Sequence, residues 1–185
     1  MIIETLKEVG ALLEGHFLLS SGFHSDKYIQ CARLLQYPDL SAKVLKGVVD
    51  KITDWDFDAI IGPAIGGIIV SYELGRLMGK RTFFSERENG RMIFRRGFTL
   101  DKGSRVLIAE DVITTGKSVL EVAELVESCG AQVAGIACIV MRTKKDIGYM
   151  VYSGAYVDAD NYKPEECPLC EKGLSIQKPG SRIMI

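Results

Sequence analysis

The sequence predicts an α/β fold with a mostly parallel central sheet and helices on both faces. Short apolar runs typical of buried strands, at 59–61, 105–109 and 132–140, alternate with segments of helical periodicity at 68–78 and 118–129. This alternation indicates a parallel sheet, because each helix carries the chain back to the edge where the next strand begins. Ligands of such folds bind beyond the carboxyl ends of the strands, so we expect a site in the loops that follow them.

The remaining segments agree with this layout. Apolar residues recur at helical spacing near the N-terminus, and Pro38 stands where a proline favours the first turn of a helix. The other predicted elements, in chain order, are a helix within 2–13, strands at 16–19 and 27–31 around the polar turn 20–26, a helix at 38–52, a strand at 82–84, and a strand at 92–94 as half of a hairpin.

Composition indicates one globular domain over residues 1–185. Hydrophobic residues make up 47% of the chain and charged residues 25%, which excludes a disordered chain. The net charge of -1 and the pI of about 6.2 give no overall attraction to nucleic acid or to an anionic membrane. We therefore expect neither of these as a partner.

The same sequence favours a soluble cytoplasmic protein. Glu4, Lys7 and Glu8 interrupt the N-terminal segment where a signal peptide would be apolar. The longest apolar stretch, 59–70, contains Pro63 and three glycines and is too short to span a bilayer. Five cysteines at irregular spacing do not describe a disulfide framework.

The segment after the predicted strand 105–109 carries the chemistry. We call it the phosphate loop, and its residues are Glu110, Asp111, Val112, Ile113, Thr114, Thr115, Gly116, Lys117 and Ser118. It lies where a strand gives way to a helix, whose free N–H groups and positive dipole end favour a phosphate. Its hydroxyls and Lys117 add donors. The acidic pair can accept hydrogen bonds from ribose hydroxyls or hold a hydrated Mg²⁺.

The ending Gly-Lys-Ser suggests a P-loop, but the spacing excludes one. A Walker A loop needs a glycine five residues before Gly116, and that position is Asp111. The alternative without a ligand is a capped helix beside two solvated acids. The agreement of acids, hydroxyls, glycine and strand context in one string favours a binding loop.

The string Glu-Asp-Val-Ile-Thr-Thr-Gly-Lys-Ser resembles the PRPP (5-phosphoribosyl 1-pyrophosphate) signature of the type I phosphoribosyltransferases. The resemblance implies that the phosphate loop binds the 5′-phosphate of PRPP and that Glu110 and Asp111, as catalytic residues, contact the ribose hydroxyls. It also implies Mg²⁺ as cofactor, bound mainly through PRPP and pyrophosphate. The signature alone leaves the base open.

Thr114 and two further segments resemble the orotate phosphoribosyltransferases. Hypoxanthine–guanine enzymes typically carry an aspartate where this chain has Thr114, and a neutral threonine suits a pyrimidine that arrives as an anion. Residues 18–30 resemble the N-terminal hood, in which Tyr28 would flank the base, and Arg142 stands where the family keeps an arginine for orotate. The resemblance implies that Thr114, Arg142 and Tyr28 bind orotate, with the hood formed by residues 1–35.

The segment 61–67 is similar to the family's pyrophosphate loop, which implies that Ile65 and Gly66 contact PRPP. The C-terminal extension 150–185, from Cys-Pro-Leu-Cys to Pro-Gly-Ser-Arg, resembles one bacterial branch of the family. We therefore expect PRPP and orotate as substrates and a homodimer with shared active sites, the assembly that the resemblance implies.

The chain also departs from the family. Many orotate enzymes carry lysines at the positions of Ser20 and Gly66, and their mobile loop is rich in lysine and contains a histidine. Here the loop 85–97 has neither, although residues 80–96 contain six basic side chains against two acidic ones. We expect Arg87, as a catalytic residue, and Arg91 to contact PRPP. Which arginine replaces the family lysine stays open.

Cys167 and Cys170 have the spacing of zinc ligands, but they form a lone pair. A four-ligand site would need a second pair, for example from a neighbouring copy. We expect reduced tail cysteines, no protein-bound metal, and ordinary structural roles for His16 and His24. The other cysteines, Cys31, Cys129 and Cys138, stand in apolar segments and are predicted to belong to the core.

Three other functions remain as alternatives. One is a purine or uracil phosphoribosyltransferase, which base specificity would distinguish. Another is a regulator that binds PRPP without turnover, although such proteins usually need a basic nucleic-acid face or an added DNA-binding module. A module for protein interaction alone would leave the phosphate loop unexplained.

Overall fold

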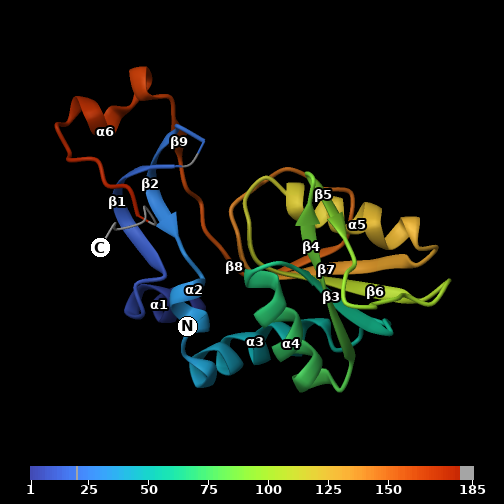
Figure 1. The fold of residues 1–185 in the computed structure, drawn as a ribbon. Helices are drawn as coiled ribbons and strands as arrows, with labels where there is room; N and C mark the ends of the chain where they lie inside the picture. The colour runs from blue at the N-terminus through green and yellow to red at the C-terminus, as the bar shows by residue number, and fades with distance from the viewer. Residues whose placement is uncertain (20, 180–185) are drawn as a thin grey trace.

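The computed structural model describes residues 1–19 and 21–179, which form two sheets (Figure 1). The large sheet has, in order across it, the strands β5 (Arg91–Ile93), β4 (Arg81–Glu88), β3 (Ala59–Pro63), β6 (Arg105–Ile113), β7 (Gln132–Met141) and β8 (Val151–Tyr156). The four neighbouring pairs from β4 to β8 are parallel, and only the β4–β5 hairpin is antiparallel. The predicted α/β fold with a mostly parallel sheet is confirmed.

Helices cover both faces of this sheet. One face packs against α3 (Pro38–Ile52) and α4 (Gly66–Met78), and the other against α5 (Lys117–Ser128). Strand β6 shows why its sequence is continuously apolar: Leu107 and Ala109 point to the first face and Val106 and Ile108 to the second. A strand covered on both faces has no solvent-facing positions, so the alternation of apolar and polar residues disappears.

The second sheet forms the hood together with the tail. It contains β1 (Leu12–Leu18), β2 (His24–Ile29) and β9 (Asn161–Tyr162), and β1 and β2 are antiparallel. In Figure 1 the red tail lies against the blue N-terminal strands. The short helices here are α1 (Ile2–Glu8), α2 (Ala32–Leu35), a 3₁₀ turn (Pro164–Glu166) and α6 (Pro168–Glu171).

Several boundaries differ from the sequence prediction, among them the strand predicted at 82–84, which continues to Glu88. The hood strands begin three to four residues earlier than expected, at Leu12 and His24. Strand β6 continues to Ile113, because Val112 and Ile113 pair with Val140 and Met141 of β7, so Glu110 and Asp111 lie within the strand. Residues 151–156, which we had assigned to the C-terminal extension, form the edge strand β8 of the large sheet.

None of the helices within residues 1–19 and 21–179 combines the length and the apolar character that a membrane crossing requires. Ser20 and residues 180–185, which include the end of the predicted Pro-Gly-Ser-Arg motif, lie outside the described residues.

Candidate active site

The phosphate loop forms the turn between β6 and α5. Gly116 precedes the helix with φ of +81°, a left-handed conformation that favours glycine, and a Cβ there would lie 2.9 Å from Ile147 Cγ2. The loop encloses a cavity of about 30 Å³ at the N-terminus of α5, where the first-turn N–H groups point toward it. Its lining is Glu110, Val112, Ile113, Thr114, Thr115, Gly116, Lys117, Ser118 and Val119. All predicted phosphate-loop residues except Asp111 therefore line one cavity.

The acidic pair sits at the buried edge of this loop. Glu110 is only 8% exposed, and the Asp111 N–H donates to its Oε1 at 3.0 Å. Burial, and then the charge of Asp111, raise the pKa of Glu110 from 4.5 to about 9. The raised pKa favours the protonated form of Glu110 at neutral pH. Hydroxyl donors or a cation beside it would favour loss of that proton.

Glycines bring the β3–α4 loop against the acidic pair. A Cβ on Gly66 would lie 2.4 Å from Asp111 Oδ2, and a Cβ on Gly62 would lie 1.9 Å from the Gly67 carbonyl oxygen. The predicted pyrophosphate loop can therefore approach β6 only because these positions lack side chains. Ile65, in this loop, is 81% exposed. The Asp111 carboxylate therefore occupies the space that a side chain at position 66, such as the lysine that the family often carries there, would enter.

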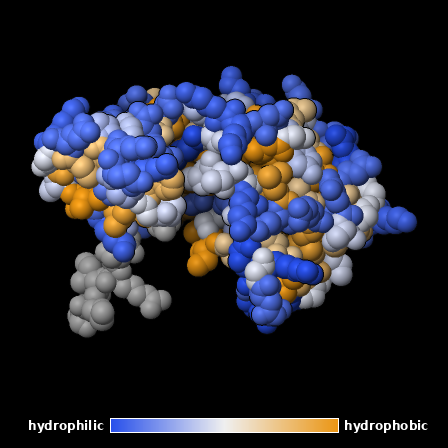
Figure 2. All heavy atoms as spheres, turned by 90° about the horizontal axis from the view of Figure 1, so that it is seen from above, coloured by the Kyte–Doolittle hydropathy of each residue, from blue (hydrophilic) through white to orange (hydrophobic). Residues whose placement is uncertain are grey.

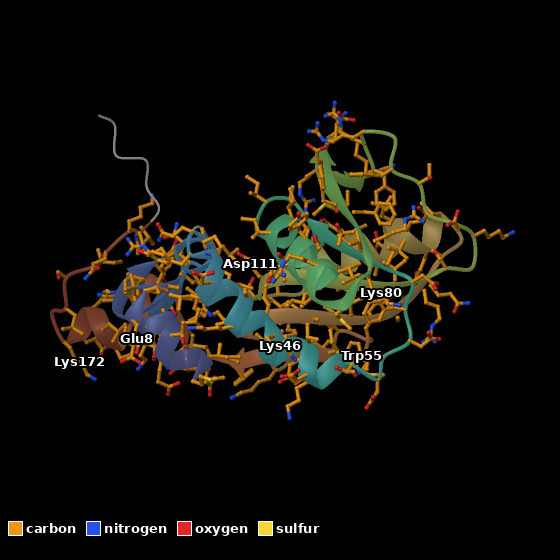
Figure 3. The ribbon with its side chains drawn as sticks, turned by 90° about the horizontal axis from the view of Figure 1, so that it is seen from below. Glu8, Lys46, Trp55, Lys80, Asp111 and Lys172 are labelled. Carbon is orange, nitrogen blue, oxygen red and sulfur yellow. The ribbon has the colours of Figure 1, made fainter. Side chains whose placement is uncertain are left out.

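A larger cleft of about 780 Å³ lies between the hood and the large sheet. Figure 2 shows the molecule hollowed between its two lobes, and in Figure 3 Asp111 lies between the hood side, marked by Glu8, and the far end marked by Lys80. The cleft is lined by Leu18, Leu19, Ser21, Phe23, Tyr28, Ile29, Thr114, Thr115, Arg142, Asn161, Lys178 and Pro179. The three predicted orotate-binding residues, Tyr28, Thr114 and Arg142, thus meet in one cleft, which shares Thr114 and Thr115 with the phosphate cavity.

Arg142 follows β7 and reaches the hood. Its Nη2 donates to Ser25 Oγ at 3.3 Å and to Asn161 Oδ1 at 3.5 Å. Both acceptors are neutral, so neither of them neutralises the positive charge of the guanidinium on the wall of the cleft. Partial burial lowers the pKa of Arg142, but an arginine remains protonated at physiological pH.

The two predicted arginines of the β4–β5 hairpin lie outside both cavities. Arg87 forms an ion pair with Glu121 of α5 and donates to the Gly90 carbonyl oxygen at 3.1 Å. Arg87 lowers the pKa of Glu121, whose carboxylate also lies 3.9 Å from Lys117 Nζ. Arg91 is exposed. The contact of Arg87 and Arg91 with PRPP stays a prediction.

Several residues of the cleft were missed by sequence reasoning. Asn161, Lys178 and Pro179 come from the tail, and Phe23 comes from the β1–β2 turn. The tail residues reach the cleft because β9 pairs with β2 and because Phe17 forms a bridge with Gln177. Pairing between segments so distant leaves no periodic signal in either one.

Comparison with known proteins identifies the family. The model of the phosphoribosyl transferase domain matches residues 33–169. Over 182 residues the chain is 48% identical to the orotate phosphoribosyltransferase of Caldicellulosiruptor bescii, covering 97% of this chain and 96% of that protein. The chain belongs to the orotate phosphoribosyltransferase family. The resemblance read from the phosphate loop, the hood and Arg142 is confirmed at this level.

Solved structures agree with the family and show how widely its fold is used. The orotate phosphoribosyltransferase of Aeropyrum pernix superposes with a TM-score of 0.72 at 28% identity, covering 85% of this chain and 94% of that one. The adenine phosphoribosyltransferase of Thermoanaerobacter pseudethanolicus gives a TM-score of 0.61 at 20% identity, covering 70% and 87%. The second likeness concerns the fold alone, so the orotate family and an adenine enzyme share this architecture.

Proposed function

We propose that the protein transfers the 5-phosphoribosyl group of PRPP to orotate, which gives orotidine 5′-phosphate and pyrophosphate, a step of pyrimidine biosynthesis. The observation that carries the proposal is the pair of connected cavities. The smaller one has the donors of a phosphate site, and the larger one brings Tyr28, Thr114 and Arg142 together. Thr114 and Thr115 line both, so the two cavities adjoin at these residues.

The chain's own groups suit this reaction. The N-terminus of α5 and Lys117 would hold the 5′-phosphate, and Glu110 and Asp111 would accept hydrogen bonds from the ribose hydroxyls. Arg142 would hold the orotate carboxylate, and Tyr28 would flank the ring. These contacts would place the base beside ribose C1′, where positioning supplies much of the rate acceleration for a displacement.

Mg²⁺ belongs to the proposal as a cofactor bound mainly through PRPP. The residues fit it, because the buried Glu110 and the partly buried Asp111 supply carboxylate oxygens, which Mg²⁺ prefers, beside the phosphate cavity. When bound, the ion would neutralise charge that develops on the departing pyrophosphate. Arg87 and Arg91 would add positive charge on the side of the β4–β5 hairpin.

A base-specificity assay tests the proposal. Purified protein is incubated with PRPP, Mg²⁺ and one of orotate, uracil or hypoxanthine, and pyrophosphate release is measured. We expect turnover with orotate and loss of that turnover when Mg²⁺ is chelated. A clear preference for hypoxanthine or uracil would refute the choice of base, and PRPP binding without pyrophosphate release for any base would indicate a regulator.

Asp111→Asn tests the role of the acidic pair. The substitution keeps the shape of the side chain but removes the charge that would grip the ribose hydroxyls, so kcat should fall by roughly 100-fold or more, as when a strong transition-state contact is lost. Asp101→Asn is the matched control, because Asp101 is exposed and contacts only Arg81 among the ion pairs of the described chain. Wild-type kinetics for Asp111→Asn would refute the assignment.

We also propose a homodimer with shared active sites in the cytoplasm. Ile65, Ile69 and Tyr72 lie one above the other along the start of α4 and are 81%, 43% and 66% exposed, an apolar stripe suited to a partner subunit. All five cysteines are free, as expected where thiols are kept reduced. Light scattering at assay concentration should give the mass of a dimer, and a fully active monomer would refute shared sites.

A further inference from the structure

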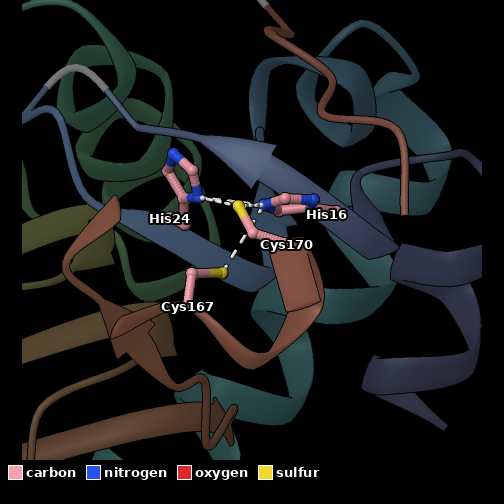
Figure 4. Close-up of side chains that lie close together, drawn as sticks. All are labelled: His16, His24, Cys167 and Cys170. Atoms are coloured by element: carbon pink, nitrogen blue, oxygen red, sulfur yellow. Dashed lines mark hydrogen bonds between the residues drawn. The ribbon is translucent and has the colours of Figure 1, made fainter. Parts of the chain in front are cut away.

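Four potential metal ligands meet on the outer side of the hood. They are His16 from β1, His24 from β2, and Cys167 and Cys170, which flank the first turn of α6 (Figure 4). One nitrogen from each imidazole and the two sulfurs all lie within 4.8 Å of one another. His16, His24 and Cys167 are 3%, 7% and 1% exposed, whereas Cys170 reaches the surface. The sequence pattern indicated only the cysteine pair as potential metal ligands, and the fold brings the two histidines beside it.

Four of the six distances between these atoms are close to those around a tetrahedral zinc ion, and all six are 4.8 Å or less. Zinc lies about 2.0–2.1 Å from a histidine nitrogen and about 2.3 Å from a cysteine sulfur, so tetrahedral ligands are about 3.3 Å apart for two nitrogens and about 3.6 Å for nitrogen and sulfur. Here His16 Nε2 lies 2.9 Å from His24 Nδ1, 3.6 Å from Cys167 Sγ and 3.7 Å from Cys170 Sγ. Cys170 Sγ lies 3.3 Å from His24 Nδ1.

Hydrogen bonds alone account poorly for this cluster. Three polar atoms approach Nε2 of His16, yet a neutral imidazole has only one acceptor nitrogen with a single in-plane lone pair. Nδ1 of His16 lies 2.8 Å from the Leu174 carbonyl oxygen, which can only accept, so Nδ1 carries the proton and Nε2 is free to act as a ligand. This arrangement orients metal-binding histidines in many proteins.

The backbone prepares the four positions. Leu18 pairs with His24, and His16 stands two residues before Leu18, so the two imidazoles are diagonal neighbours on one face of the hood sheet. A bulge between Glu14 and Phe17 turns this part of β1. The Cys170 N–H donates to the Cys167 carbonyl oxygen at 3.1 Å, which folds the C-x-x-C segment so that both sulfurs point the same way.

We propose that these four residues form a structural Zn²⁺ site. Two sulfurs and two nitrogens in a tetrahedron suit zinc, and four protein ligands leave no open position for catalysis. The charge also balances, because two thiolates neutralise the ion in a region that is largely buried. The site lies in the hood, apart from the phosphate cavity and its carboxylates.

The proposed site fastens the tail to the wall of the base cleft. The β1–β2 turn between His16 and His24 contributes Leu18, Leu19, Ser21 and Phe23 to the cleft, and the tail on either side of the cysteines contributes Asn161, Lys178 and Pro179. Zinc would fix the position of the tail relative to the β1–β2 turn. This consequence for orotate binding rests on the proposed function, whereas the presence of zinc does not.

Metal analysis tests the site directly. Full-length protein without a histidine tag is produced in zinc-supplemented medium, purified without chelator and measured by plasma mass spectrometry. We expect about one zinc per chain in the wild type and roughly a tenfold loss in Cys167→Ser. Cys129→Ser is the matched control, because Cys129 is a half-buried cysteine at the end of α5, and it should keep its zinc.

Cobalt gives a second readout that does not depend on activity. Wild-type protein loaded with Co²⁺ should show the strong visible bands of a tetrahedral ion and the near-ultraviolet charge transfer from sulfur, and Cys170→Ser should lose the sulfur contribution. A folded wild-type protein that contains no zinc after reduction and incubation with Zn²⁺ would overturn the proposal. A Cys167–Cys170 disulfide in the intact mass, or iron in place of zinc, would do the same.

The link to the cleft has its own test. Cys170→Ser should raise the KM for orotate severalfold with less effect on the KM for PRPP, whose phosphate loop belongs to the large sheet. If the wild type contains stoichiometric zinc but a zinc-free variant keeps the same KM for orotate, the zinc site would stand and its effect on orotate binding would be overturned. Zinc in a protein that turns over none of the bases would leave the site standing and overturn the proposed function.

Discussion

At neutral pH the ligand-free protein should hold a proton on the buried pair Glu110–Asp111, so Glu110→Gln should stabilise it increasingly as the pH rises. The pKa of Glu110 is raised from 4.5 to about 9, first by burial and then by the charge of Asp111. A pKa above the unfolded value means that the folded protein binds this proton more tightly. The stability that the proton contributes is therefore complete below pH 4.5 and is lost as the pH approaches 9.

The size of the effect follows from the width of this window. Each pH unit inside it costs about 1.4 kcal/mol of folding free energy for one proton, which gives roughly 4 kcal/mol between pH 5 and pH 8. The amide of Glu110→Gln does not titrate, so the variant should not lose this folding free energy as the pH rises. In a chain of this size 1 kcal/mol shifts the Tm by about 2–4 °C, so the Tm difference between variant and wild type should grow by about 10 °C over this interval.

Thermal unfolding of the two proteins from pH 5 to pH 9 measures this difference, and other titrating groups cancel because both proteins share them. Glu124→Gln, an exposed change of the same kind on α5, should run parallel to the wild type. A parallel course for Glu110→Gln would refute the shared proton. The same proton should leave when PRPP binds, so calorimetry in two buffers of different ionisation heat should detect its release in the wild type and not in the variant.

Two further substitutions test the geometry of the site. Gly66→Ala would place a Cβ 2.4 Å from Asp111 Oδ2, so kcat/KM for PRPP should fall by at least about tenfold. Gly47→Ala, in an open position of α3, is the control and should leave kcat/KM unchanged. If Gly66→Ala were as active as the wild type, the close approach of the β3–α4 loop to Asp111 would be contradicted. Arg142→Gln removes a charge-assisted hydrogen bond worth about 1.5–3 kcal/mol, so the KM for orotate should rise roughly 10- to 100-fold while the KM for PRPP stays the same. An equal rise of both constants would indicate a structural role for Arg142.

The phosphate loop was predictable because its signals are local. The apolar run of β6, the acids, the hydroxyls and Gly116 follow one another in a single segment, and the fold only has to place a helix after a strand. The one error concerned its boundary. Acidic residues suggested that the strand ends at Ala109, but pairing with β7 extends it to Ile113. The acids are therefore held by a strand, and the burial that results raises the pKa of Glu110.

The hood was only half predictable, because its second half comes from the other end of the chain. Cys167 and His16 are 151 residues apart in sequence, yet Cys167 Sγ lies 3.6 Å from His16 Nε2. Neither segment alone indicates this contact, since a lone C-x-x-C pair and a histidine in a strand are both common without metal. The tail residues Asn161 and Lys178 enter the cleft for the same reason, through the pairing of β9 with β2.

The proposed function divides its two substrates between the two sheets. The family model begins at residue 33, after β1 and β2, so the shared part is the large sheet with the phosphate loop. The side chains that would face the ring, Tyr28 and Phe23, lie in the hood, outside the matched range. Under the proposed function, PRPP would be held by the large sheet, whereas the choice of base would depend mainly on the hood and on the contacts that hold the tail against it.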